Sequence, residues 1–143
     1  MPIKPYHQLL ALLLLCCAAS LQAADDYLVN ASPEHVNGAT TINTTKAKEL
    51  FNEGVIFIDV RSQMAFDKGR IPDAVLLDLK TDFTKENLAA EVAPSDPLII
   101  YCQGPKCTRA AVAIEKALQW GYQEVYYYRE GFPSWKEAGH PVE

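Results

Sequence analysis

The chain has 143 residues, and its 13 lysines and arginines against 18 aspartates and glutamates give a formal net charge of −5 at pH 7. This length suits a single domain. An acidic chain without a basic run lacks the electrostatic footprint that binds nucleic acid or anionic lipid, so we expect neither of these partners.

Residues 1–23 have the three-part pattern of a secretory signal peptide. Lys4 precedes an apolar run over residues 9–19, and small residues that suit a cleavage site follow it. A transmembrane helix needs about 20 apolar residues, so this run is too short to span a bilayer. We therefore predict cleavage after Ala23. The mature protein is then expected to be periplasmic or secreted and not bound to the membrane. The alternatives are a retained anchor and lipid attachment through a cysteine of the run.

The mature chain is predicted to begin with a polar lead-in. Residues 24–40 show no sustained periodicity, and we interpret them as an extended segment before a domain over residues 41–143. At the start of this domain, Thr44 or Thr45 is expected to cap a short helix that Gly54 ends.

Four short, apolar and largely β-branched runs are typical of strands that are buried on both faces. They cover residues 55–60, 74–77, 98–101 and 125–127. Between the third and fourth runs, residues 108–120 carry apolar side chains at the spacing of one helical face, and Gly121 is expected to end this helix. Strands that alternate with helices predict an α/β fold with a parallel sheet.

Cys102 lies at the predicted junction between the strand over residues 98–101 and the helix over residues 108–120. In parallel sheets, ligands bind at the carboxyl ends of the strands. Loop N–H groups and the helix N-terminus would point toward the sulfur, lower the thiol pKa and hold a thiolate or a persulfide. No histidine lies near the loop, and a lowered pKa can replace a general base. The alternative is a buried packing cysteine, which the Gly104-Pro105 loop disfavours.

The loop after Cys102 is the predicted substrate site. Lys106 and Arg109 would add positive potential for a small anionic sulfur donor such as thiosulfate. The remaining residues predicted to contact the donor are Gln103, Gly104, Cys107 and Thr108. We expect no cofactor and no metal ion.

Residues 101–109 resemble the active-site loop of the rhodanese family, in which a nucleophilic cysteine follows a central strand and a short loop leads into a helix that opens with Ser or Thr. Residues 57–61, 66–74 and 131–142 resemble further parts of the family's pattern, in the right order. The resemblance implies a rhodanese-like α/β fold, with a central mostly parallel sheet of about five strands and helices on both faces. It also implies a single-domain sulfurtransferase. Such an enzyme would move sulfane sulfur from thiosulfate or a similar donor to a thiol or protein acceptor through a Cys102 persulfide.

The first two of these further stretches contain charged residues and departures from the family. Asp59 and Arg61, two positions apart, lie at the end of a predicted strand, and we expect them to fix a loop by pairing rather than to bind substrate. Ala65, Arg70 and Asp73 stand where the family often has an acidic residue, a histidine and a glycine. The family's usual ion pairing at this turn is therefore not expected to carry over unchanged.

The fold of cysteine phosphatases is similar, and the length of the loop distinguishes the two chemistries. Those phosphatases place five residues and then an arginine after their cysteine, and the arginine fork grips the phosphate. After the same five residues here, Thr108 stands where those phosphatases have their arginine, and Arg109 comes one position later, which matches the shorter loop of sulfurtransferases. The spacing favours sulfur transfer.

Cys107 is a second departure, because the family often has a basic or small residue at this position. Two cysteines in an oxidising compartment usually form a disulfide. Cys107 has three open roles: it resolves the Cys102 persulfide with release of sulfide, it forms a regulatory or redox-catalytic disulfide, or it packs against the helix. The alternative functions are accordingly a thiol-disulfide redox protein that uses Cys102 and Cys107, and a non-catalytic rhodanese-like binding module. If the two cysteines form a disulfide, the sulfurtransferase has a thiol reductant as a further partner, because Cys102 has to be reduced before it carries sulfur.

Overall fold

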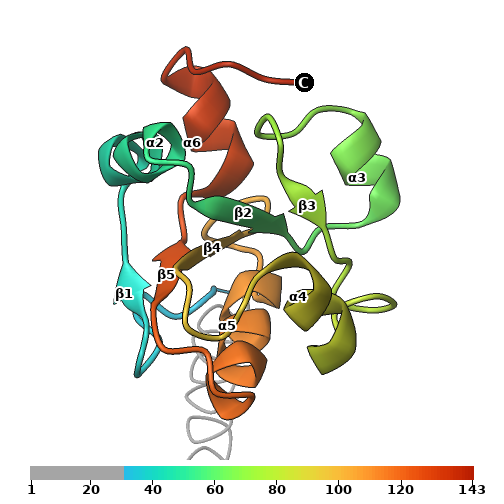
Figure 1. Cartoon of the computed structure of the whole chain (residues 1–143). Coiled ribbons are helices and arrows are strands. Elements are labelled where there is room, and N and C mark those ends of the chain that lie inside the picture. Colours follow the sequence, from blue (N-terminus) through green and yellow to red (C-terminus); the bar gives the residue numbers. More distant parts are fainter. Residues whose placement is uncertain (1–30) are drawn as a thin grey trace, which may run out of the picture. The chain divides into compact units, whose positions relative to one another are not determined.

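The computed structural model describes residues 31–143 (Figure 1). The signal peptide predicted over residues 1–23 and the first part of the lead-in lie outside the described residues. Within the described part, no helix is both long and apolar enough to cross a membrane.

Five parallel strands form one sheet in the order β1-β5-β4-β2-β3. They are β1 (Thr40–Thr41), β2 (Ile56–Asp59), β3 (Val75–Leu76), β4 (Leu98–Tyr101) and β5 (Val125–Tyr128). The strand β4 lies at the centre, and the register aligns Asp59, Tyr101 and Tyr128 at the carboxyl ends of their strands. The predicted parallel sheet is confirmed, and Cys102 follows its central strand.

The sequence pattern does not predict the strand β1. It consists of two threonines at the boundary of the lead-in, and they pair with Tyr126 and Tyr127 of β5. A strand of this length has no periodicity of its own, so its pairing depends on the position of β5.

Helices cover both faces of the sheet (Figure 1). The described helices are α2 (Thr44–Asn52), α3 (Gln63–Asp67), α4 (Lys85–Glu91), α5 (Arg109–Gln119) and α6 (Gly131–Glu137). The helices α4 and α5 cover one face, and α2 and α6 cover the other (Figure 1). The predicted cap of α2 is wrong: the side chain of Asn43, and not of Thr44 or Thr45, accepts the N–H of Lys46 at 2.9 Å.

The two faces of β4 pack into different cores. Ile100 and Cys102 belong to the buried cluster beneath α5, whereas Ile99 and Tyr101 belong to the cluster that α2 and α6 cover. Successive side chains of a strand point to opposite faces of the sheet. Trp135 of α6 is fully buried in the second cluster, as expected for a core residue.

Candidate functional site

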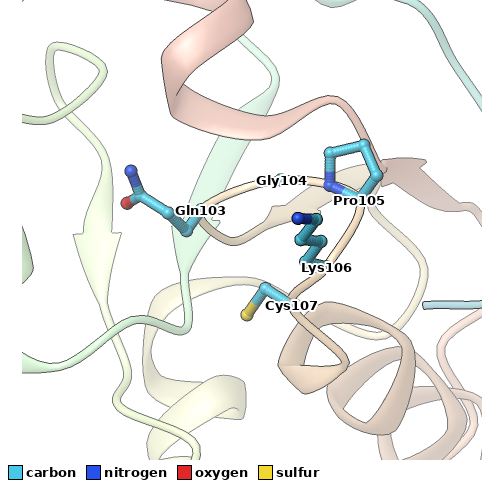
Figure 2. A pocket seen from close by; sticks show the side chains of 5 residues that line it. All are labelled: Gln103, Gly104, Pro105, Lys106 and Cys107. Carbon is cyan, nitrogen blue, oxygen red and sulfur yellow. The ribbon is translucent and has the colours of Figure 1, made fainter. Parts of the chain in front are cut away.

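The candidate site is the loop that joins β4 to α5. Cys102 directly follows the central strand, and residues 103–108 lead to the first residue of α5, Arg109. Figure 2 shows the side chains of Gln103, Lys106 and Cys107 projecting from this short loop. Gln103 points away from the other two, so the loop presents different groups to its two sides.

The structure joins the sulfurs of Cys102 and Cys107 in a disulfide, with a Cα–Cα distance of 6.3 Å. This separation lies within the usual range for disulfides. Cys102 is only 3% exposed, whereas Cys107 is half-buried. The bond ties the two ends of the loop together and occupies the sulfur of the predicted nucleophile, so sulfur chemistry at Cys102 requires reduction first.

Most amide groups of the loop are free to bind an anion. Among residues 31–143, the backbone N–H groups of five residues donate no hydrogen bond: Gln103, Gly104, Lys106, Thr108 and Arg109. The N–H of Cys107 donates to the carbonyl of Gly104 at 2.9 Å. Clustered backbone donors next to a helix N-terminus favour negative charge, so the loop suits a thiolate, a persulfide or an anionic donor.

The start of α6 packs directly against the backbone of the loop. The N–H of Phe132 donates to the carbonyl of Cys102 at 3.1 Å. Gly131 has a positive φ of 70°, and a Cβ at this position would collide with the same carbonyl oxygen. The contact requires a glycine because of both the space and the backbone conformation.

The lead-in holds the other end of the loop. The N–H and the hydroxyl of Ser32 both donate to the carbonyl of Pro105, at 2.8 and 2.7 Å. Arg129 in turn donates to the carbonyls of Ser32 and Pro33. Ser32 itself is 3% exposed, so its two bonds to Pro105 start from a buried residue, whereas the bond from Arg129 to Pro33 is exposed. No local sequence signal identifies Ser32, because its partner lies 73 residues away.

On the opposite face of the sheet, a buried ion pair supports the strand ends. Arg61 donates to the carboxylate of Asp59 through Nε at 3.0 Å and Nη2 at 2.7 Å, and both residues are at most 4% exposed. The Tyr101 hydroxyl donates to the same carboxylate at 2.6 Å. Arg61 also donates to the side chain of Gln103 at 3.2 Å and so connects this pair to the loop.

The charges of this network stabilise one another. Burial lowers the pKa of Arg61, but the hydrogen bond and charge of Asp59 outweigh it and raise that pKa overall. Burial, together with the charge of Asp59, raises the pKa of Tyr101 well above its ordinary value. Tyr101 therefore stays a neutral donor. The sequence indicated pairing of Asp59 with Arg61 but gave no signal for Tyr101.

The two predicted cations of the loop have different environments. Arg109 donates to the carboxylate of Asp78 at 3.0 Å and to the carbonyl of Val60 at 3.2 Å. Lys106 is exposed and, within the described part of the chain, makes no ion pair. Lys106 is thus the cation of the loop that remains available to an anion.

Pockets flank the loop on both sides. One of about 240 Å³ is lined by Arg61, Ser62, Met64, Ala65, Lys68, Gln103 and Phe132. The segment from Gln103 to Cys107 also borders an open hollow (Figure 2). The described residues contain no cluster of metal-binding side chains. The seven residues predicted for the nucleophile and the substrate site thus lie together between the end of β4 and the start of α5, and Gln103, Gly104, Lys106 and Cys107 among them line a pocket.

A model of the family described as rhodanese-like domain matches residues 32–138. The chain belongs to this family. The predicted family and fold are therefore confirmed.

Relatives of this chain include proteins named as thiosulfate sulfurtransferases. The chain is 31% identical over 93 residues to the thiosulfate sulfurtransferase GlpE of Pseudomonas syringae pv. syringae (strain B728a), over 64% of this chain and 81% of that protein. At the level of the family, such relatives support a rhodanese-type sulfurtransferase, which implies a sulfur donor and a thiol acceptor.

Solved rhodanese-like structures share the fold. The human single-domain sulfurtransferase TSTD1 matches with a TM-score of 0.60 at 22% identity, over 69% of this chain and 96% of that chain. A protein of unknown function from Rhodopseudomonas palustris CGA009, described as a possible tyrosine phosphatase, matches with a TM-score of 0.61 at 25% identity, over 73% and 85%. These matches show the fold alone, which does not choose between sulfur and phosphate chemistry.

The turn within residues 66–74 departs from the family's pattern at Arg70 and Asp73, and both residues have a structural explanation. Asp73, in place of the common glycine, has a positive φ of 60°. An aspartate tolerates this left-handed conformation better than most residues. Arg70, in place of the common histidine, pairs with the carboxylate of Glu143 at 3.2 Å. The ion pair of this turn thus involves Glu143 instead of a residue close to Arg70 in the sequence.

Proposed function

We propose that this chain is an exported sulfurtransferase that moves sulfane sulfur from thiosulfate or a similar donor to a thiophilic acceptor through a persulfide on Cys102. The observation that carries the proposal is the disulfide at the end of β4. In it, the Cys107 sulfur is bonded to Cys102 as the outer sulfur of a persulfide would be. The loop therefore accommodates a second sulfur atom on Cys102.

The reaction starts from reduced protein. The Cys102 thiolate attacks the outer sulfur of thiosulfate, a sulfur–sulfur bond forms, and sulfite leaves with the electron pair of the broken bond. A thiol or cyanide then attacks the outer sulfur of the persulfide, and the Cys102 thiolate leaves. The free N–H groups of the loop and Lys106 bind the anions of both steps. The position of Thr108, where a phosphatase has its arginine, supports sulfur over phosphate.

The signal-peptide pattern of residues 1–23 supports export to the periplasm or beyond the cell. In an oxidising compartment the Cys102–Cys107 disulfide persists, so the exported enzyme uses a thiol reductant as a further partner. Fractionation of cells that produce the full chain tests this: a protein found in the cytoplasm with residues 1–23 still attached contradicts export.

Intact-mass measurement tests the persulfide. The protein is reduced, freed of reductant and incubated with thiosulfate. We expect the gain of one sulfur atom in the native chain and none in Cys102→Ser. An equal gain in Cys102→Ser, or no gain in the native chain, overturns the proposal. Cys107→Ser serves as the matched control, since it keeps the nucleophile and one thiol.

The disulfide also favours a second candidate, a thiol-disulfide redox protein that uses Cys102 and Cys107. Its signature is reduction of insulin, or oxidation of a dithiol substrate, that is lost in Cys107→Ser while sulfur loading of Cys102 survives. A protein that shows neither activity after full reduction is a binding module instead.

A further inference from the structure

The two sulfurs of the Cys102–Cys107 disulfide are not equally accessible. Cys102 is 3% exposed and belongs to the buried cluster that also contains Val60, Ala110 and Ala111. Cys107 is half-buried and lies at the edge of this cluster, on the segment that borders the open hollow (Figure 2). A thiolate that attacks Cys102 has to displace core side chains, whereas one that attacks Cys107 does not.

The charge of Lys106 also favours attack at the sulfur of Cys107. The side chain next to Cys107 is the exposed cation of Lys106, which makes no ion pair within the described residues. Arg109, on the other side, is paired with Asp78 at 3.0 Å. A thiolate is an anion, so the positive potential beside Cys107 raises its local concentration there.

The stability of the departing thiolate also favours attack at Cys107. Thiol-disulfide exchange is faster when the departing sulfur is better stabilised as a thiolate. Attack on Cys107 releases Cys102, which lies at the end of β4 next to a loop in which most N–H groups, that of Cys107 excepted, donate no hydrogen bond among residues 31–143. Attack on Cys102 would instead release Cys107 at the rim of the loop.

We propose that thiol reductants attack the disulfide at Cys107 and release Cys102 directly as a thiolate. The reductant's sulfur forms a mixed disulfide with Cys107, and the electron pair of the broken bond goes to Cys102. A second thiol then attacks the reductant's sulfur, which leaves Cys107 as a thiol and the reductant as a disulfide. Two thiols are oxidised and one protein disulfide is reduced. The inference rests on the proposed function, because the released thiolate is the group that takes up sulfane sulfur.

In this scheme Cys107 has a defined task. It covers the nucleophile in the oxidised state and receives the reductant, so Cys102 is never bound to the reductant and is free as soon as the first bond breaks. The reductant is a small thiol or an exposed cysteine of a thiol-disulfide oxidoreductase.

Trapping the mixed disulfide tests this assignment. Oxidised full-length protein is mixed briefly with reduced glutathione, quenched in acid and alkylated with N-ethylmaleimide. Trypsin cleaves after Lys85, Lys106 and Arg109, so the two cysteines fall on separate peptides, residues 86–106 and residues 107–109. We expect glutathione on residues 107–109 and N-ethylmaleimide on residues 86–106. The expected excess is roughly tenfold, which corresponds to about 1.4 kcal/mol in activation free energy.

The same protein unfolded in guanidinium is the matched control. Both sulfurs are then exposed, and we expect the preference to disappear. Glutathione mainly on residues 86–106, an equal distribution in the native protein, or an oxidised protein whose two cysteines both alkylate freely overturns the inference. No sulfur donor is present, so the result is independent of the intact-mass test with thiosulfate. A chain that is trapped at Cys107 but gains no sulfur loses the proposed function and keeps this exchange chemistry.

Discussion

Tyr101 and Cys102 are neighbours in the chain but serve two different regions at the end of β4. On the side of Tyr101, the carboxylate of Asp59 and the guanidinium of Arg61 are buried and paired, and among residues 31–143 no buried side-chain polar atom lacks a partner. On the side of Cys102, most loop N–H groups donate no hydrogen bond within that range, and a disulfide closes the loop. One face therefore fixes the strand ends, whereas the other leaves most of its backbone donors without a partner inside the domain.

The largest expected effect on stability comes from removing the buried ion pair of Asp59 and Arg61. Asp59→Asn leaves the charge of Arg61 buried without a counter-ion, and we expect the free energy of unfolding to fall by about 3 kcal/mol or more. Urea denaturation measures this change. The control is Asp78→Asn, because its pair with Arg109 is partly exposed, with side-chain exposures of 13% and 24%; such pairs contribute at most about 1 kcal/mol. Equal losses in the two variants contradict the contrast between the two regions.

The next effect concerns the contact between α6 and the loop. Gly131→Ala places a Cβ against the carbonyl of Cys102 and forces a positive φ on alanine. We expect a loss of about 2 kcal/mol in stability and a lower rate of sulfur loading, because the backbone of the nucleophile has to move. Gly139→Ala is the control: its φ is 77°, but a Cβ there meets nothing within 4 Å. It should lose only about 1 kcal/mol and load sulfur at the native rate. A Gly139→Ala variant that loads as slowly as Gly131→Ala refutes the steric explanation.

The contacts of Tyr101 and Gly131 also show which features of the fold and the site the sequence can predict and which it cannot. The apolar runs identify four of the strands, and the junction of strand and helix identifies Cys102, because both signals are local. The clash at Gly131 and the hydroxyl of Tyr101 are not local. Tyr101 finds its carboxylate 42 residues away, so no motif around it carries the information. The family resemblance predicts the sheet as a whole, but β1 and the true cap of α2, Asn43, depend on individual contacts.

A smaller effect comes from the disulfide itself. It closes a loop with a sequence separation of 5, and the chain-entropy relation gives about 2 kcal/mol for a loop of this size. We therefore expect reduction to lower the free energy of unfolding of the native chain by this amount, as measured by urea denaturation with and without a reductant. Cys107→Ser should show no dependence on reductant. A native chain whose stability is the same in both conditions indicates that the bond does not form in solution.

The smallest effect is expected at the lead-in, which ties the reactive region to the rest of the domain. Ser32→Ala removes the hydroxyl that donates to Pro105 but keeps the backbone bond to the same carbonyl. One such bond contributes about 1 kcal/mol. Ser134→Ala is a suitable control, since that hydroxyl makes no hydrogen bond within residues 31–143. Because Pro105 lies in the loop between the two cysteines, the loss should also speed the glutathione attack on Cys107 in Ser32→Ala but not in Ser134→Ala. If the rate of attack is unchanged while stability falls, Ser32 supports the fold without restraining the loop.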